Sequence, residues 1–211
     1  MSTTPDLASK PTIHGRLVTL RPFRDGDVEE MARVLGDPEV RRLTGSVATS
    51  HEAEQPEPLD DRLHEWYATR NEQPDRLDLA IEDRATGRLV GEVVLNELDR
   101  AALTCNLRVL VGPAGRGRGL GTEAVGLATR HGIRTLGLSR VTLEVLEFNP
   151  RAQRVYEKVG YVVTGVRPDA LRFDGVAVAA IDMAVDAATW PGFPPPGGAG
   201  GQSGPTVAGS G

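Results

Sequence analysis

A run of glycine and arginine residues, Gly115–Thr122, carries the strongest indication of chemistry in the sequence. The hydrophobic pattern predicts a strand before this run and a helix after it. Glycines let a ligand approach the backbone closely, and the first N–H groups of a helix lack partners within the helix. The helix N-terminus also carries about half a positive charge. Together these properties favour a bound diphosphate, with Arg116 and Arg118 as additional cationic donors.

Two other phosphate-binding loops are excluded by the same residues. A Walker loop requires a lysine before its serine or threonine, and here Gly121 precedes Thr122. The dinucleotide fingerprint G-x-G-x-x-G also fails, because its third glycine would fall on Leu120 or on Thr122. The diphosphate therefore belongs to another class of ligand.

The spacing that does match is Arg-x-x-Gly-x-Gly, at Arg116, Gly119 and Gly121. This pattern resembles the pyrophosphate-binding motif of the GNAT N-acetyltransferase superfamily, which implies acetyl-CoA as co-substrate. In that family the strand before the motif is bulged and splays from the next parallel strand, here Leu107–Val111 from Val141–Phe148. The resemblance assigns coenzyme contacts to this strand and loop, namely to Val109, Leu110, Val111, Arg116, Gly117, Arg118, Gly119, Leu120, Gly121 and Thr122.

A second motif, Phe148–Tyr161, resembles the other hallmark of the superfamily, Asn-x-x-Ala followed by Tyr-Glu-Lys-x-Gly-(Phe/Tyr). The resemblance implies that Asn149 hydrogen-bonds the coenzyme arm and that Tyr156 is the general acid for the departing thiolate. A phenol with a pKa near 10 can protonate a thiolate with a pKa near 8.5 without being ionised at neutral pH. A packing role for Tyr156 stays open, because it lies on the apolar stripe of its predicted helix.

The general base is less well indicated. Relatives often have a glutamate at the start of the strand before the loop, where this chain has Asn106, which cannot act as a base. Glu92 and Glu144 are the candidate carboxylates, and we favour Glu92 because its strand should lie beside the loop strand. Solvated surface positions are the alternative for both.

The acceptor is expected to be a primary amine. The opening segment Leu20–Asp27 resembles the RimJ/RimL-like branch, which contains ribosomal-protein N-terminal alanine acetyltransferases, and so favours a peptide N-terminus. Acidic residues crowd residues 52–65 and could instead attract a small cation such as a polyamine or aminoglycoside, although such a run is often only a solvated face. A non-catalytic acyl-CoA-binding module is the remaining alternative.

The elements that must position these residues follow from the switching hydrophobic period. Together they predict an α/β fold with a mixed sheet of about seven strands, flanked by about four helices and with splayed parallel strands in the middle. The expected strands are Arg16–Phe23, Leu77–Glu82, Leu89–Leu98, Cys105–Val111, Val141–Phe148, Tyr161–Val166 and Val176–Val185. The expected helices are Asp25–Leu35, Leu59–Asn71, Gly119–Leu136 and Pro150–Val159.

Length and composition limit the remaining possibilities. The 211 residues favour one domain over residues 13–190, with residues 1–12 and 191–211 disordered. The net charge of −5 argues against nucleic acid as a partner, and no apolar run is long enough to span a membrane. A single cysteine, Cys105, fits a reducing, cytoplasmic location. The four histidines lack metal-ligand spacing, so no metal site is expected. A monomer and a homodimer are both compatible with the sequence.

Overall fold

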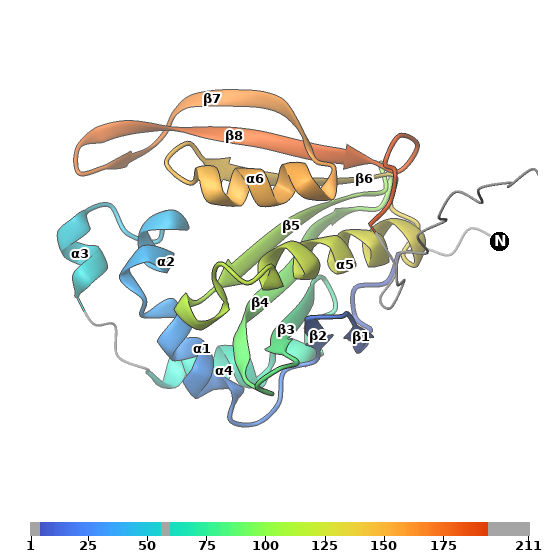
Figure 1. The fold of residues 1–211 in the computed structure, drawn as a ribbon, viewed down its shortest axis with the longest axis horizontal. Coiled ribbons are helices and arrows are strands. Elements are labelled where there is room, and N and C mark those ends of the chain that lie inside the picture. The colour runs from blue at the N-terminus through green and yellow to red at the C-terminus, as the bar shows by residue number, and fades with distance from the viewer. Residues whose placement is uncertain (1–4, 56–59, 194–211) are drawn as a thin grey trace, which may run out of the picture.

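The computed structural model describes residues 5–55 and 60–193, and these form a single eight-stranded sheet with helices on both faces (Figure 1). The strands are β1 (Ile13–His14), β2 (Val18–Arg21), β3 (Leu77–Asp83), β4 (Leu89–Asp99), β5 (Thr104–Val111), β6 (Arg140–Leu146), β7 (Val162–Phe173) and β8 (Val176–Asp186). The helices are α1 (Asp27–Leu35), α2 (Pro38–Leu43), α3 (Ser50–Glu54), α4 (Asp61–Ala68), α5 (Leu120–Arg134) and α6 (Pro150–Val159), with short 3₁₀ turns η1 (Arg70–Glu72) and η2 (Pro113–Gly115). The mixed sheet is confirmed, with one strand and two helices more than expected.

One of the two additional helices, α2, begins directly after the predicted end of the first helix. Gly36, Asp37 and Pro38 terminate α1 as predicted, but Asp37 also caps α2 by accepting a hydrogen bond from the Val40 N–H, and Pro38 stands at the first helical position. Helix α3 lies between two expected helices, in a segment for which no element was expected. Leu59, the expected start of the next helix, lies outside the described residues.

Two layers of apolar side chains cover the two faces of the sheet. Helices α5 and α6 pack on one face in the main core, while α1, α2 and α4 pack on the other against β3 and β4 (Figure 1). Strands β2 and β3 are thereby buried on both faces, and this removal of apolar surface from water is the main favourable term for such an arrangement, whereas most of β7 remains exposed. Within the described ranges, no helix is long and apolar enough to span a bilayer.

The strands run antiparallel except at one place, where β5 and β6 pair in parallel. This parallel pairing covers only Thr104–Asn106 against Arg140–Thr142, and the strands part beyond it. On the opposite side, β5 lies very close to β4: a Cβ atom placed on Gly91 would stand 1.9 Å from the Leu110 carbonyl oxygen. The predicted splay is therefore present, and glycine is required beside it.

The first described residues differ from the prediction of a disordered segment over residues 1–12. Leu7 is fully buried in the main core, and the Lys10 ammonium donates to the carbonyl oxygens of Leu7, Gln73 and Arg76. At the other end, the buried Trp190 donates from its indole N–H to the Val159 carbonyl at 2.7 Å. Residues 1–4 and 194–211, also predicted to be disordered, lie outside the described residues.

Candidate functional site

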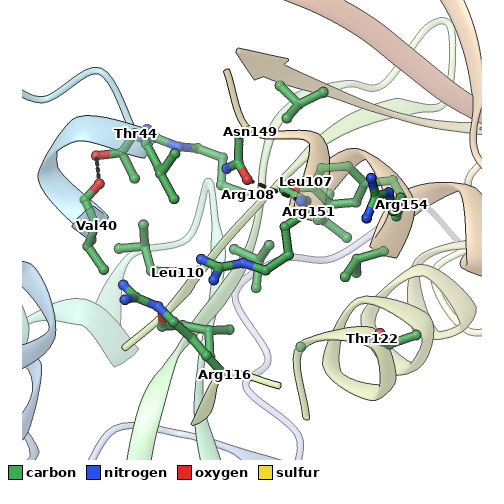
Figure 2. A pocket seen from close by; sticks show the side chains of 18 of the residues that line it. Val40, Thr44, Leu107, Arg108, Leu110, Arg116, Thr122, Asn149, Arg151 and Arg154 are labelled. Carbon is green, nitrogen blue, oxygen red and sulfur yellow. Dashed lines mark hydrogen bonds between the residues drawn. The ribbon is translucent and has the colours of Figure 1, made fainter. Parts of the chain in front are cut away.

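A cavity of about 680 Å³ occupies the gap between the parting ends of β5 and β6 (Figure 2). Its walls come from β5, from the loop that precedes α5, from β6 and α6, and from α2. Most of the residues predicted to bind the coenzyme or to donate the proton line this cavity, namely Val109, Leu110, Val111, Arg116, Gly117, Gly119, Gly121, Thr122, Asn149 and Tyr156. The fold therefore brings together two motifs that are about thirty residues apart in the sequence.

The loop before α5 presents main-chain donors. Gly117 and Gly119 have φ angles of 72° and 81°, in the left-handed region that side-chain-bearing residues rarely adopt. As a result, the main-chain N–H groups from Gly117 to Thr122 donate to no acceptor among the described residues. Unpaired amides at a helix N-terminus, beside a cavity, are suited to an anion such as a diphosphate.

The first turn of α5 also anchors this loop to the rest of the sheet. The Glu123 carboxylate accepts hydrogen bonds from the N–H groups of Arg16, Leu17 and Val18 at 2.9, 2.6 and 2.8 Å. A Cβ on Gly119 would lie 3.3 Å from the Leu17 side chain, so the chain before β2 packs directly on the loop. The loop is thus held in shape by contacts that do not use its own N–H groups.

The two loop arginines act differently from the expectation that both are phosphate donors. Arg116 lines the cavity, but its guanidinium is bound to Asp37 and Glu39, both at 2.5 Å. Arg118 donates to the buried Asp83 at 2.8 Å and is not among the lining residues. Leu120 is likewise buried in the core. For Arg118 and Leu120, the structure supports a role in fixing the loop rather than a contact made through the side chain.

Asn149 and Tyr156 are positioned by helix α6, whose bounds match the prediction. The Asn149 side-chain oxygen caps the helix by accepting from the Ala152 N–H at 3.1 Å, and Gly160 closes it with a φ of 105°. The amide nitrogen of Asn149 makes no hydrogen bond with a described residue. It is therefore available to a ligand in the cavity.

Tyr156 lines the cavity from the same helix while its ring packs edge-on against Tyr161, with ring centroids 5.9 Å apart. Its hydroxyl makes no hydrogen bond with a described residue. Burial raises the pKa of Tyr156 to about 12, so the group is a proton donor throughout the neutral range. Packing and proton donation, which the sequence presents as alternatives, are compatible in this geometry.

The comparison with known families identifies the family of this chain. The family profile described as "Acetyltransferase (GNAT) domain" matches residues 17–162, more than half of the chain. The chain belongs to the GNAT acetyltransferase family. The matched range includes the loop before α5 and the whole of α6, so both motifs lie within it.

Relatives of known name include N-acetyltransferases of several kinds. An N-acetyltransferase 9-like protein of Caenorhabditis briggsae is 29% identical over 149 residues, covering 66% of this chain and 71% of the relative. A spermidine N(1)-acetyltransferase of Escherichia coli (strain K12) is 30% identical over 111 residues, covering 49% of this chain and 60% of that enzyme. A crystal structure of spermidine N-acetyltransferase from Vibrio cholerae with CoA and spermine superposes with a TM-score of 0.70 at 21% identity, covering 82% and 96% of the two chains.

Glu92, which the sequence favours as the general base, does not line the cavity. It is buried on the α4 side of the sheet, where it accepts hydrogen bonds from Arg70 at 3.0 Å and from the Tyr67 hydroxyl at 3.2 Å. Burial raises the pKa of Glu92, and the neighbouring Arg70 opposes the rise. Glu92 is not among the lining residues, so its observed contacts are structural.

Two other carboxylates of this GNAT domain do line the cavity, Glu97 and Glu144. Glu144, the second sequence candidate, lies two residues beyond Thr142, the last residue of β6 paired with β5, and is bound by Arg167. Glu97 sits in a bulge of β4 with a φ of 55°, and the sequence analysis missed it because no local signal marks that bulge. Both stand near the closed end of the gap, whereas the loop stands at its open end.

Four cationic side chains of the cavity were also missed: Arg108, Arg151, Arg154 and Lys158. The last three recur at helical spacing on α6, and this periodic basic face was the signal that could have revealed them. With Arg116, the lining has five cations and two carboxylates, which suits an anionic ligand. Within the described ranges, no cluster of side chains forms a metal site.

Proposed function

We propose that this GNAT enzyme transfers the acetyl group of acetyl-CoA to a primary amine of a small cationic molecule of the polyamine class. The observation that carries the proposal is the set of unpaired main-chain N–H groups from Gly117 to Thr122 beside a cavity that also exposes Tyr156. The donor set fits a diphosphate, and the glycines leave room for it.

The two carboxylates of the cavity support a cationic acceptor. Glu97 and Glu144 stand at the closed end of the gap, on the far side from the loop that suits the diphosphate. An acceptor that carries a second ammonium would find its counter-charge there. The relatives whose names specify spermidine agree with this choice, which replaces the peptide N-terminus favoured by the sequence resemblance.

The bound co-substrate supplies a thioester with a thiolate leaving group. The residues of this chain bind and orient it and transfer the protons. The Gly117–Thr122 amides and the Asn149 amide nitrogen hold and orient the co-substrate. The Tyr156 hydroxyl is available to protonate the leaving sulfur. Glu144 is available to take a proton from the amine, directly or through water, and Arg167 holds this carboxylate in place through an ion pair.

Replacing Glu144 by glutamine should lower kcat/KM for the amine by about tenfold to 100-fold, because the variant cannot accept a proton. The KM for acetyl-CoA should change little, since the phosphate-binding loop is untouched. Steady-state kinetics with each substrate varied in turn measures both quantities. The matched variant is Glu92→Gln, which removes the same charge from β4, the strand on the other side of β5 from β6.

Glu92→Gln should mainly cost stability, by roughly 3 kcal/mol, because it leaves the buried Arg70 with less counter-charge. The rate per folded molecule should remain near that of the wild type when measured well below the variant's Tm. The reverse pattern, with activity lost in Glu92→Gln and kept in Glu144→Gln, would return the base to Glu92.

The overall proposal is tested by incubating the enzyme and acetyl-CoA with a panel of amines. The panel holds polyamines, an aminoglycoside, lysine and a peptide with a free N-terminus. The readouts are thiol release and the mass increase of roughly 42 Da that one acetyl group adds to a product. We expect the highest kcat/KM with a polyamine. A peptide preferred over every polyamine would overturn the acceptor class. Coenzyme binding without turnover of any amine would favour a non-catalytic acyl-CoA-binding module.

A further inference from the structure

One carboxylate joins the two sides of the cavity. Glu39, on α2, pairs with Arg116 from the loop at 2.5 Å and with Arg151 from α6 at 2.8 Å. Figure 2 shows the side chains of Arg116 and Arg151 both extending toward α2. Three elements that are far apart in the sequence are therefore linked through a single anion, at the place where the cavity is otherwise basic.

The two arginines differ in how firmly they are held. The Arg116 side chain is 16% exposed, and its three guanidinium nitrogens donate to Asp37, Glu39 and the Val111 carbonyl. The Arg151 side chain is 53% exposed, and one nitrogen donates to Glu39. Arg116 thus connects α2 and β5 through bonds at all three of its guanidinium nitrogens. Arg151 holds Glu39 through an exposed pair of the kind that contributes little stability.

We propose that Glu39 is an internal anion that a phosphate group of the coenzyme replaces on Arg151. The inference rests on the proposed use of acetyl-CoA. A guanidinium binds a phosphate with two parallel hydrogen bonds, which is stronger than one bond to an exposed carboxylate. Arg151 lines the same cavity as the unpaired amides of the loop, and its side chain is half exposed, so a ligand bound there is accessible to its guanidinium.

The exchange would couple coenzyme binding to the position of α2, which forms one wall of the cavity. Helix α2 contributes Val40, Leu43 and Thr44 to the lining, and Glu39 lies on the same short helix. Release of Arg151 leaves α2 attached to the loop through Arg116 and detaches it from α6. Glu39 is therefore a positioning residue that lowers coenzyme affinity and links coenzyme binding to the shape of the α2 wall.

The test is the dissociation constant of acetyl-CoA, measured by calorimetry on the full chain. Glu39→Gln should bind acetyl-CoA about twofold to fivefold more tightly, as expected when an exposed competing pair is removed. The gain should disappear when Arg151→Ala is added, because the cation freed by the first change is then absent. Glu29→Gln, on an exposed face of α1 away from the cavity, removes the same charge and should leave the constant unchanged.

Acetyl-dephospho-CoA, which lacks the 3′-phosphate, identifies the phosphate that Arg151 binds. A gain retained with this ligand assigns the diphosphate, and a gain lost with it assigns the 3′-phosphate. The Tm of every variant is recorded without ligand to confirm that each is folded.

Three results would overturn the inference. They are an unchanged or weaker affinity in Glu39→Gln, an equal gain in Glu29→Gln, and a gain that persists in the Glu39→Gln, Arg151→Ala double variant. A wild-type chain that binds no acetyl-CoA would instead refute the proposed function on which the inference rests.

Discussion

Replacement of Gly119 by glutamate should weaken acetyl-CoA binding by about 100-fold or more, because several charge-assisted hydrogen bonds are lost at once. Gly119 caps α5 with a φ of 81° and lines the cavity between amides that have no described acceptor. A glutamate there places a negative charge where a diphosphate is expected and also strains the backbone. Calorimetric titration with acetyl-CoA measures the loss.

Gly119→Ala separates the charge from the strain. Alanine has the same difficulty with a positive φ, at a cost of roughly 1–2 kcal/mol, and its Cβ would also stand 3.3 Å from Leu17. It should therefore lower the Tm and weaken acetyl-CoA binding far less than glutamate does. Equal affinities in the two variants would mean that the loop does not face the phosphates of the coenzyme.

Tyr156→Phe should reduce kcat by about 100-fold, the effect of losing a positioned general acid. The Kd of acetyl-CoA should stay within about twofold of the wild-type value, because a phenylalanine keeps the edge-on contact with Tyr161 and the lost hydroxyl has no described partner. Pre-steady-state measurement of the chemical step, alongside titration of the coenzyme, gives the two numbers. Comparable losses in rate and affinity would show that Tyr156 only packs.

The pH dependence of the wild type provides a second measure of this tyrosine. Burial raises its pKa to about 12, and a raised pKa keeps an acid protonated to higher pH. The ordinary pKa of a phenol is about 10. Deprotonation of Tyr156 should therefore cause no fall in kcat between neutral pH and a pH of about 10. A decline in kcat centred below that value, present in the wild type and absent from Tyr156→Phe, would contradict the assigned environment.

The sequence predicted best the parts of the site that local backbone requirements determine. Gly117 and Gly119 adopt positive φ angles that few other residues tolerate, and Gly160 closes α6 in the same way. Asn149 and Pro150 mark the start of α6 through capping and a fixed φ. Each of these signals lies within a few residues of the feature that it specifies.

What the sequence could not predict depends on contacts between distant segments. Alternation along β4 places Glu92 on a face, but only the fold shows that Arg70 and Tyr67 occupy that face. The ion pairs of Arg116 could not be predicted, because its partners, Asp37 and Glu39, belong to the start of a helix that was not expected. Leu7 was assigned to a disordered segment because a single apolar residue gives no periodic signal, although it completes the core.

The close approach at Gly91 has a consequence for the width of the gap at its open end, beside the loop that precedes α5. Strand β5 has β4 on one side and the gap toward β6 on the other, and its Leu110 carbonyl lies against a position of β4 that carries no side chain. Any larger residue at this position would drive β5 across into the gap and narrow it. The room at the open end of the gap therefore depends partly on a residue of β4 that does not line the cavity, so a substitution there can change this width without altering a lining residue.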